Sequence, residues 1–148
     1  AMARDSEARG NLAAGLAALA RAERRLGDLM LALAHASEAA QIARQINAPA
    51  CEMWGELEIG LARLSLGDLE AAEEHTRRAV DLTSQGDERW IGIEQVHQAH
   101  ARVLSVLDRH EAAAEQERLA EDIIAAKTAR IPDQQQQRRY LESAMRGP

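Results

Sequence analysis

The tetrapeptide Leu26-Gly27-Asp28-Leu29 recurs as Leu66-Gly67-Asp68-Leu69, 40 residues further along the chain. An altered copy, Leu107-Asp108-Arg109-His110, follows 41 residues after the second. Glycine can end a helix in a left-handed conformation that a Cβ atom disfavours, and aspartate tolerates that conformation better than most residues. An aspartate after the glycine can also cap the next helix. The repeated tetrapeptide therefore predicts a tight turn between two helices at three places in the chain.

Helix-breaking segments divide the 148 residues into units of about the repeat length. Asn47-Ala48-Pro49, Gln85-Gly86-Asp87 and Ile131-Pro132-Asp133 contain Pro or Gly, which interrupt helices. Between them we expect hairpins of two antiparallel helices, and after the last break a terminal helix. The whole chain is expected to form a single all-α domain over residues 1–148, with hairpins at about 6–46, 51–84 and 88–128 and a capping helix at about 133–145.

The composition favours helices and argues against a β-fold. Alanine and leucine are abundant and are good helix formers, whereas the chain has two Trp, one Tyr and no Phe. The formal net charge is −6 at pH 7, and the scattered basic residues give no basic face for nucleic acid. The longest apolar run is too short to span a bilayer, and the charged N-terminus is unlike a secretory signal. We therefore expect a cytoplasmic protein that contacts neither membranes nor nucleic acids directly.

Small residues occupy nine corresponding places in the three predicted hairpins. They allow two helices to cross near the close end of the usual axis separation of ~8–10 Å. The pattern resembles the tetratricopeptide repeat family, whose members place small residues where their helices cross. This resemblance implies that the hairpins stack as a right-handed solenoid. The nine residues are Ala20, Gly60 and Ala101 in the first helices, Ala32, Ala72 and Ala113 early in the second helices, and Ala39, Ala79 and Ala120 later in them.

The units of about 40 residues are longer than the repeat of about 34 that is usual in the family. The chain is similar to a branch with longer helices, the repeat arrays of bacterial maltose-regulator-type and other signal-transduction ATPase transcription regulators. The similarity rests on Leu66–His75, Ala79–Leu82 and Gly86–Arg89, and on the tail at Ala129–Asp133 and Arg138–Glu142. It implies that the chain is a regulatory segment of a larger signalling protein.

In this family the first helix of each hairpin lines a concave groove. The resemblance therefore implies a protein or peptide partner, and Trp and Arg in the expected lining are common anchors at protein contacts. Two alternatives stay open: the chain is a homo-oligomerisation module, or it is a sensor that binds a small-molecule inducer. The residues that we expect in the groove are Arg21, Arg24, Trp54, Glu58, Leu61, Gln98 and Arg102.

Catalytic and metal-binding motifs are weak in this sequence. Glu94, His97 and His100 lie close to one face of a predicted helix, and a metal site there is a less favoured alternative. A di-iron bundle needs a second Glu-x-x-His motif, which the sequence lacks. Cys51 is the only cysteine, and no His or Asp can be assigned to it as a catalytic partner. We therefore expect no enzyme activity, no metal and no cofactor.

Overall fold

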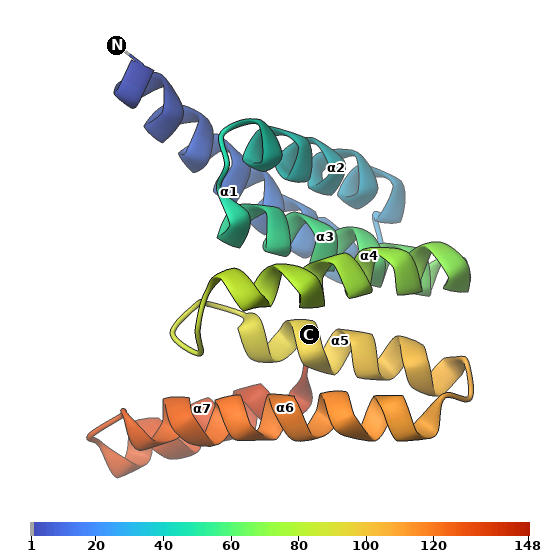
Figure 1. Cartoon of the computed structure of the whole chain (residues 1–148), viewed down its shortest axis with the longest axis vertical. Helices are drawn as coiled ribbons and strands as arrows, with labels where there is room; N and C mark the ends of the chain where they lie inside the picture. The colour runs from blue at the N-terminus through green and yellow to red at the C-terminus, as the bar shows by residue number, and fades with distance from the viewer. Residues whose placement is uncertain (1) are drawn as a thin grey trace. The chain divides into compact units, whose positions relative to one another are not determined.

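The computed structural model describes residues 2–148, which form seven α-helices and one turn of 3₁₀-helix and contain no strand. The expected all-α class is therefore confirmed (Figure 1). The chain divides into two compact units, the first ending at Gln85 and the second running from Gly86 to Pro148. The elements are α1 (Met2–Leu26), α2 (Leu29–Gln45), α3 (Pro49–Ser65), α4 (Leu69–Leu82), the 3₁₀ turn (Thr83–Gln85), α5 (Ile93–Val106), α6 (His110–Ala129) and α7 (Gln134–Arg146).

The first unit consists of α1 to α4 and the 3₁₀ turn. Consecutive helices pack against each other, so that the four helices form two antiparallel hairpins (Figure 1). α1 also contacts α3, which brings together the first helices of the two hairpins. An aliphatic cluster with Leu33 and Ile59 as its largest members draws on α1, α2 and α3. The two hairpins of this unit therefore share one core.

The nine small residues at the expected helix crossings are all buried, which confirms this part of the prediction. Two glycines of α3 show how closely the helices approach. A Cβ on Gly55 would lie 2.9 Å from the amide nitrogen of Ala40 and 3.1 Å from the carbonyl oxygen of Ala36, both in α2. A Cβ on Gly60 would lie 2.6 Å from Cγ2 of Thr76 in α4. α3 fits between α2 and α4 because it carries no side chain at these two positions.

The hairpin turns have the backbone conformation that the repeated tetrapeptide predicts. Gly27, Gly67 and Asp108 have φ angles of 88°, 80° and 60°, all in the left-handed region. Asp68 caps α4, because its carboxylate accepts a hydrogen bond at 3.2 Å from the amide three residues further on. The expected cap at Asp28 is wrong, because this residue occupies the N-cap of α2 without a side-chain hydrogen bond.

The second unit consists of α5, α6 and α7. α5 and α6 form an antiparallel hairpin, and α7 packs against α6. The expected start of the third hairpin at about residue 88 is wrong, because α5 begins at Ile93. In the segment before α5, the carboxylate of Asp87 accepts a hydrogen bond from the backbone amide of Arg89 at 2.8 Å. The indole of Trp90 covers Gly86, and a Cβ on Gly86 would lie 2.0 Å from the ring. Gly92, with a φ angle of 81°, then leads into the helix.

The last helix, α7, lies where the sequence predicts a capping helix. Asp133 caps it, because its carboxylate accepts the amide hydrogen of Gln136 at 3.0 Å. The side chain of Gln137 donates to the carbonyl oxygens of Thr128 and Ile131 at 3.3 and 2.6 Å. These bonds tie the first turn of α7 to the end of α6 and to the loop between them.

Candidate functional site

An ion pair in the first unit joins two of the expected groove residues. Nε of Arg24 on α1 donates to Oε2 of Glu58 on α3 at 2.7 Å, and Nη2 lies 3.4 Å from the other carboxylate oxygen. The two side chains are only 10% and 4% exposed. A buried guanidinium that contacts both oxygens of a carboxylate has a defined orientation. The pair therefore fixes α1 against α3, the first helices of two successive hairpins.

The expected groove residues of the first unit differ in how much surface they offer to a partner. Leu61 is 2% exposed and offers almost none. Arg24 and Glu58 are largely buried and neutralise each other. Arg21 on α1 and Trp54 on α3 are half-buried. Of the five predicted residues in this unit, Arg21 and Trp54 thus keep partly exposed side chains outside the pair of Arg24 and Glu58, with Nε of Arg21 itself buried.

The two expected groove residues of the second unit hold the C-terminal end of the described chain. Nε2 of Gln98 donates to the carbonyl oxygen of Ala144 at 2.8 Å, and Nη2 of Arg102 donates to that of Pro148 at 3.3 Å. Gly147 lies between these contacts, and a Cβ on it would lie 3.4 Å from Nη2 of Arg102. The seven predicted residues therefore form two groups, five in the first unit and two in the second.

The three residues of the metal alternative do not converge on one point. Glu94, His97 and His100 are all buried. The carboxylate of Glu94 pairs with the ammonium group of Lys127, and Nδ1 of His97 lies 2.7 Å from Oε1 of Gln116. Over residues 2–148, no group of three His, Cys, Asp or Glu side chains is placed to hold a metal ion. The geometry gives this alternative no support.

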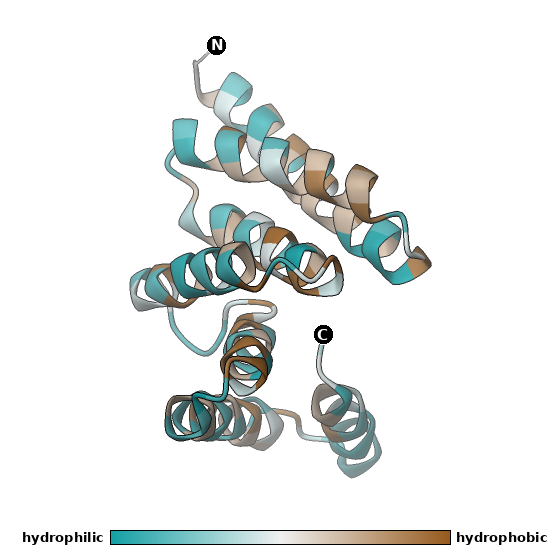
Figure 2. Ribbon diagram, turned by 90° about the vertical axis from the view of Figure 1, so that its right-hand side faces the viewer, coloured by the Kyte–Doolittle hydropathy of each residue, from teal (hydrophilic) through white to brown (hydrophobic). Residues whose placement is uncertain are grey.

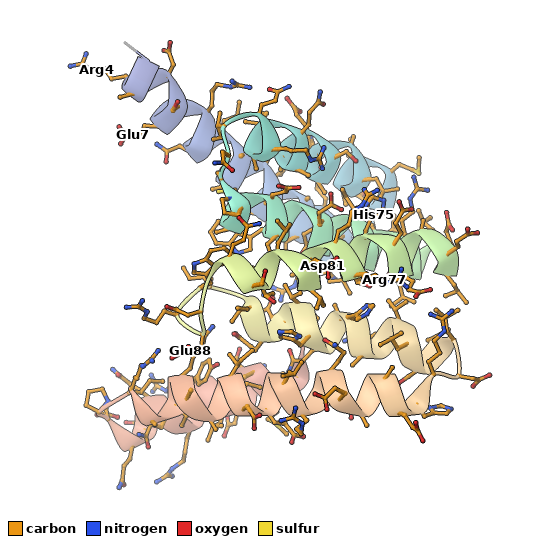
Figure 3. All side chains as sticks on the ribbon, in the orientation of Figure 1. Arg4, Glu7, His75, Arg77, Asp81 and Glu88 are labelled. Atoms are coloured by element: carbon orange, nitrogen blue, oxygen red, sulfur yellow. The ribbon has the colours of Figure 1, made fainter. Side chains whose placement is uncertain are left out.

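Carboxylate–histidine pairs link the two helices of both hairpins in the first unit, and the sequence did not lead us to expect them. Nδ1 of His35 on α2 lies 2.6 Å from Oε1 of Glu23 on α1. Nδ1 of His75 on α4, labelled in Figure 3, lies 2.5 Å from Oε2 of Glu56 on α3. Nη2 of Arg44 donates to the other oxygen of Glu56 at 3.1 Å, so this buried carboxylate has partners on both sides.

One of these pairs follows the repeat. His97 and Gln116 lie 41 residues after Glu56 and His75, so the same two positions form a polar contact in the second and third hairpins with different residue types. A search for polar residues that recur together at the repeat spacing could have found it. The pair of Glu23 and His35 has no such signal, because its two residues are 12 apart rather than 19.

A hollow of about 420 Å³ in the second unit lies beside the start of α5. Nζ of Lys127 donates to the carbonyl oxygen of Trp90 at 2.9 Å at its edge and also pairs with Glu94. The hydroxyl of Tyr140 is buried and has no hydrogen-bond partner among the described residues. Burial, and to a smaller extent the charge of Glu94, raises the pKa of Tyr140 to about 12, so the phenol remains a donor at neutral pH. The bordering residues are Arg89, Ile91, Gly92, Glu94, Gln95, Lys127, Arg130 and Tyr140.

The two arginines at this hollow are paired with carboxylates of the turn that precedes α5. Nη2 of Arg89 lies 2.7 Å from Oδ2 of Asp87, and this hydrogen-bonded contact lowers the pKa of Asp87 to about 2. Arg130 pairs with Glu88, which Figure 3 labels. A backbone hydrogen bond and the contact with Arg130 lower the pKa of Glu88. The cationic groups around the hollow are therefore held in place by neighbouring acids.

Comparison of the chain with protein-family models, with curated proteins and with solved structures gives no match. None of the helices in residues 2–148 combines the length and the apolar character that crossing a bilayer requires. The structure defines the chain as a protein built of antiparallel helix hairpins.

Proposed function

We propose that the chain is a protein-interaction module of the tetratricopeptide repeat type, a regulatory segment of a larger bacterial signalling or transcription-regulatory protein in the cytoplasm. In this proposal the hairpins stack as a right-handed solenoid, and their first helices bind a peptide or a helix. The observation that carries the proposal is the buried pair of Arg24 and Glu58, because it joins the first helices of two successive hairpins.

A rigid lining lowers the entropic cost of binding. A partner that docks on α1 and α3 does not have to order either helix, because their relative position is already set by the ion pair. Arg21 and Trp54 present partly exposed side chains on these two helices. Arginine and tryptophan are among the residue types that contribute most binding energy at protein interfaces. These two residues are therefore the proposed anchors, and Arg24, Glu58 and Leu61 hold the helices that carry them.

The second unit supplies an internal example of such recognition. Gln98 and Arg102 on α5, the first helix of the third hairpin, donate to backbone carbonyl oxygens of the chain's own last residues. Backbone carbonyl groups are present in every peptide, so amide and guanidinium donors on a first helix can bind an extended segment of many sequences. The contacts to Ala144 and Pro148 support the view that this side of a hairpin binds peptide.

The test is selection of peptides from a displayed library on the purified chain, followed by titration of the enriched peptides. Trp54→Ala and Arg21→Ala are each expected to weaken binding by about 10-fold or more, which corresponds to about 1.4 kcal/mol. Arg118→Ala is the matched control, because this arginine is exposed on α6 and pairs with Glu115 and Asp122 on the same helix. Failure to enrich any peptide, or equal binding to the Trp54→Ala chain, contradicts the proposal.

A second candidate function, sensing of a small anionic molecule, is favoured by the hollow of the second unit. The hydroxyl of Tyr140, which has no hydrogen-bond partner among the described residues, is a donor suited to a small carboxylate or phosphate. The cationic groups of Arg89, Lys127 and Arg130 also border the hollow, each of them paired with one carboxylate of the chain. Calorimetric titration with inorganic phosphate and a set of small dicarboxylates tests it. We expect a binding signal that Tyr140→Phe weakens by about 10-fold. The absence of heat with every compound of the set refutes this candidate.

A further inference from the structure

The outer face of α1 exposes large apolar side chains to solvent. Leu12, Leu19 and Leu26 are 50%, 44% and 79% exposed and recur every seven residues. The face of α1 that enters the core is formed instead by small residues such as Ala13 and Ala20, which are fully buried. Figure 2 shows hydrophobic and hydrophilic residues interspersed along the helices nearest the N-terminus. A line of exposed leucines on a folded chain indicates a surface that binds another molecule.

A small residue precedes each of these leucines by four positions. The three small residues are exposed as well, and a Cβ placed on Gly15 would meet no atom within 4 Å. Spacings of three and four residues keep all six positions on one stripe of the helix, with the seven-residue period of helices that pair side by side. We call this stripe the α1 seam, and it consists of Ala8, Leu12, Gly15, Leu19, Ala22 and Leu26.

The order of small and large residues along the α1 seam is self-complementary. The spacings from Ala8 to Leu26 are four, three, four, three and four residues, so they are the same when the seam is read in either direction. When the direction is reversed, each small residue takes the place of a large one and each large residue takes the place of a small one. In an antiparallel pair of two such helices, every leucine consequently lies opposite a small residue. The helix axes can then approach to the close end of the ~8–10 Å range. The facing residues are Leu12 with Ala22, Leu19 with Gly15 and Leu26 with Ala8, each twice because of the two-fold axis.

The residues that flank the seam agree with the same arrangement. In this register Arg25 of one helix faces Asn11 of the other, and Arg9 lies on the side of Glu23, whose carboxylate is buried against His35, so no like charges oppose each other across the seam. Leu16 faces its own copy near the two-fold axis and adds apolar surface there. A parallel pair would instead place leucine opposite leucine and Gly15 opposite Gly15, which leaves voids between the leucines.

We propose that the α1 seam binds the α1 seam of a second copy of this chain, with the two helices antiparallel and Leu19 of each seated against Gly15 of the other. Self-complementarity of size and spacing is a property that a copy of the same helix satisfies. The inference goes beyond the proposed function, because the anchors of the groove, Arg21 and Trp54, do not belong to the seam.

Sedimentation equilibrium of the full chain from about 1 to about 500 µM tests the association. We expect a monomer–dimer equilibrium that Leu19→Glu weakens by at least about 100-fold, and Gly15→Leu by at least about 10-fold. Gly15→Leu is the second variant because the space around Gly15 is open, so the added side chain should not disturb the folding of the chain. Val106→Glu is the matched control at a valine that is 52% exposed on α5, and it leaves the equilibrium unchanged. A monomer at all concentrations, or a dimer that is insensitive to both seam variants, overturns the proposal.

The orientation of the pair is tested by disulfide trapping in a Cys51→Ala background. Leu12→Cys chains are mixed with Ala22→Cys chains under mild oxidation, and mass spectrometry identifies the products. The antiparallel register predicts a cross-link between the two different variants, whereas cross-links of each variant with itself overturn it. Trp54→Ala is expected to leave the dimer intact, so failure of the proposed groove and failure of the seam give different results.

Discussion

Substitution of Gly55 by alanine tests whether close helix crossing holds the first unit together. The added Cβ would lie 2.9 Å from the amide nitrogen of Ala40 and 3.1 Å from the carbonyl oxygen of Ala36. Both obstacles are backbone atoms of α2, so no side-chain rotation can relieve the contact and the helices must move apart. Overpacking of this kind costs about 2–3 kcal/mol, the upper part of the usual range, while alanine regains about 1 kcal/mol of helix propensity over glycine. The free energy of unfolding should therefore fall by about 1–2 kcal/mol.

The assay uses the two tryptophans to separate the units. When Trp90 in the second unit is replaced by Phe, the fluorescence of Trp54 reports unfolding of the first unit alone, and a urea titration gives its free energy of unfolding. The matched control is Gly10→Ala on α1, which lies outside the α1 seam and where the new Cβ would meet only Cδ1 of Ile46 at an ordinary contact distance of 3.7 Å. This control should be more stable by up to about 1 kcal/mol. Stabilisation by Gly55→Ala as well would refute the reasoning.

Three further predictions address a turn, a buried phenol and a buried ion pair. Gly67→Ala should cost about 1–2 kcal/mol of stability through backbone strain alone, because φ is 80° and the space around Gly67 is open; an unchanged thermal midpoint would contradict this. Tyr140 is the only tyrosine, so its phenolate absorbance at alkaline pH should show a midpoint near a pKa of about 12 in the folded chain. Because this pKa is raised above the unfolded value of about 10, the contribution of the neutral phenol to the free energy of unfolding is complete below pH 10. That contribution is lost as the pH rises towards 12. A midpoint near 10 for the folded chain would be inconsistent with the burial of Tyr140. Arg24→Met leaves the carboxylate of Glu58 buried without its partner and should lower the free energy of unfolding in urea by about 3–5 kcal/mol, whereas Arg24→Met combined with Glu58→Met should recover most of this loss.

The parts of the fold that the sequence predicts well are those governed by local rules. A left-handed turn at Gly27, Gly67 and Asp108 follows from the few residue types that tolerate it. The buried positions of the nine small residues follow from the need for close crossings in successive hairpins. Both rules act within one unit of the repeat, so they can be recognised from composition and spacing without knowledge of the neighbouring helices.

The candidate site is less predictable, because it depends on which polar groups meet across helices. The family pattern assigns Arg24 and Glu58 to a lining, but it does not reveal that they bind each other and leave Arg21 and Trp54 as the partly exposed residues outside that pair. It also gives no sign that Arg102 holds the last residue of the chain. Whether two charged side chains pair depends on the crossing geometry of the helices, which spacing along one helix does not contain.

The short side chains at the crossings and the buried polar pairs have different physical roles. Alanine against alanine permits close approach, but such a contact changes little when one helix slides by a turn of about 5.4 Å. The contacts of Arg24 with Glu58 and of His75 with Glu56 are directional, and a slide of that size would break both. Small residues allow the helices to pack in several registers. We infer that the buried carboxylates select one of these registers. The variant that carries methionine at both Arg24 and Glu58 separates the two roles, because it should keep most of the stability yet give more than one set of amide resonances for α1 and α3.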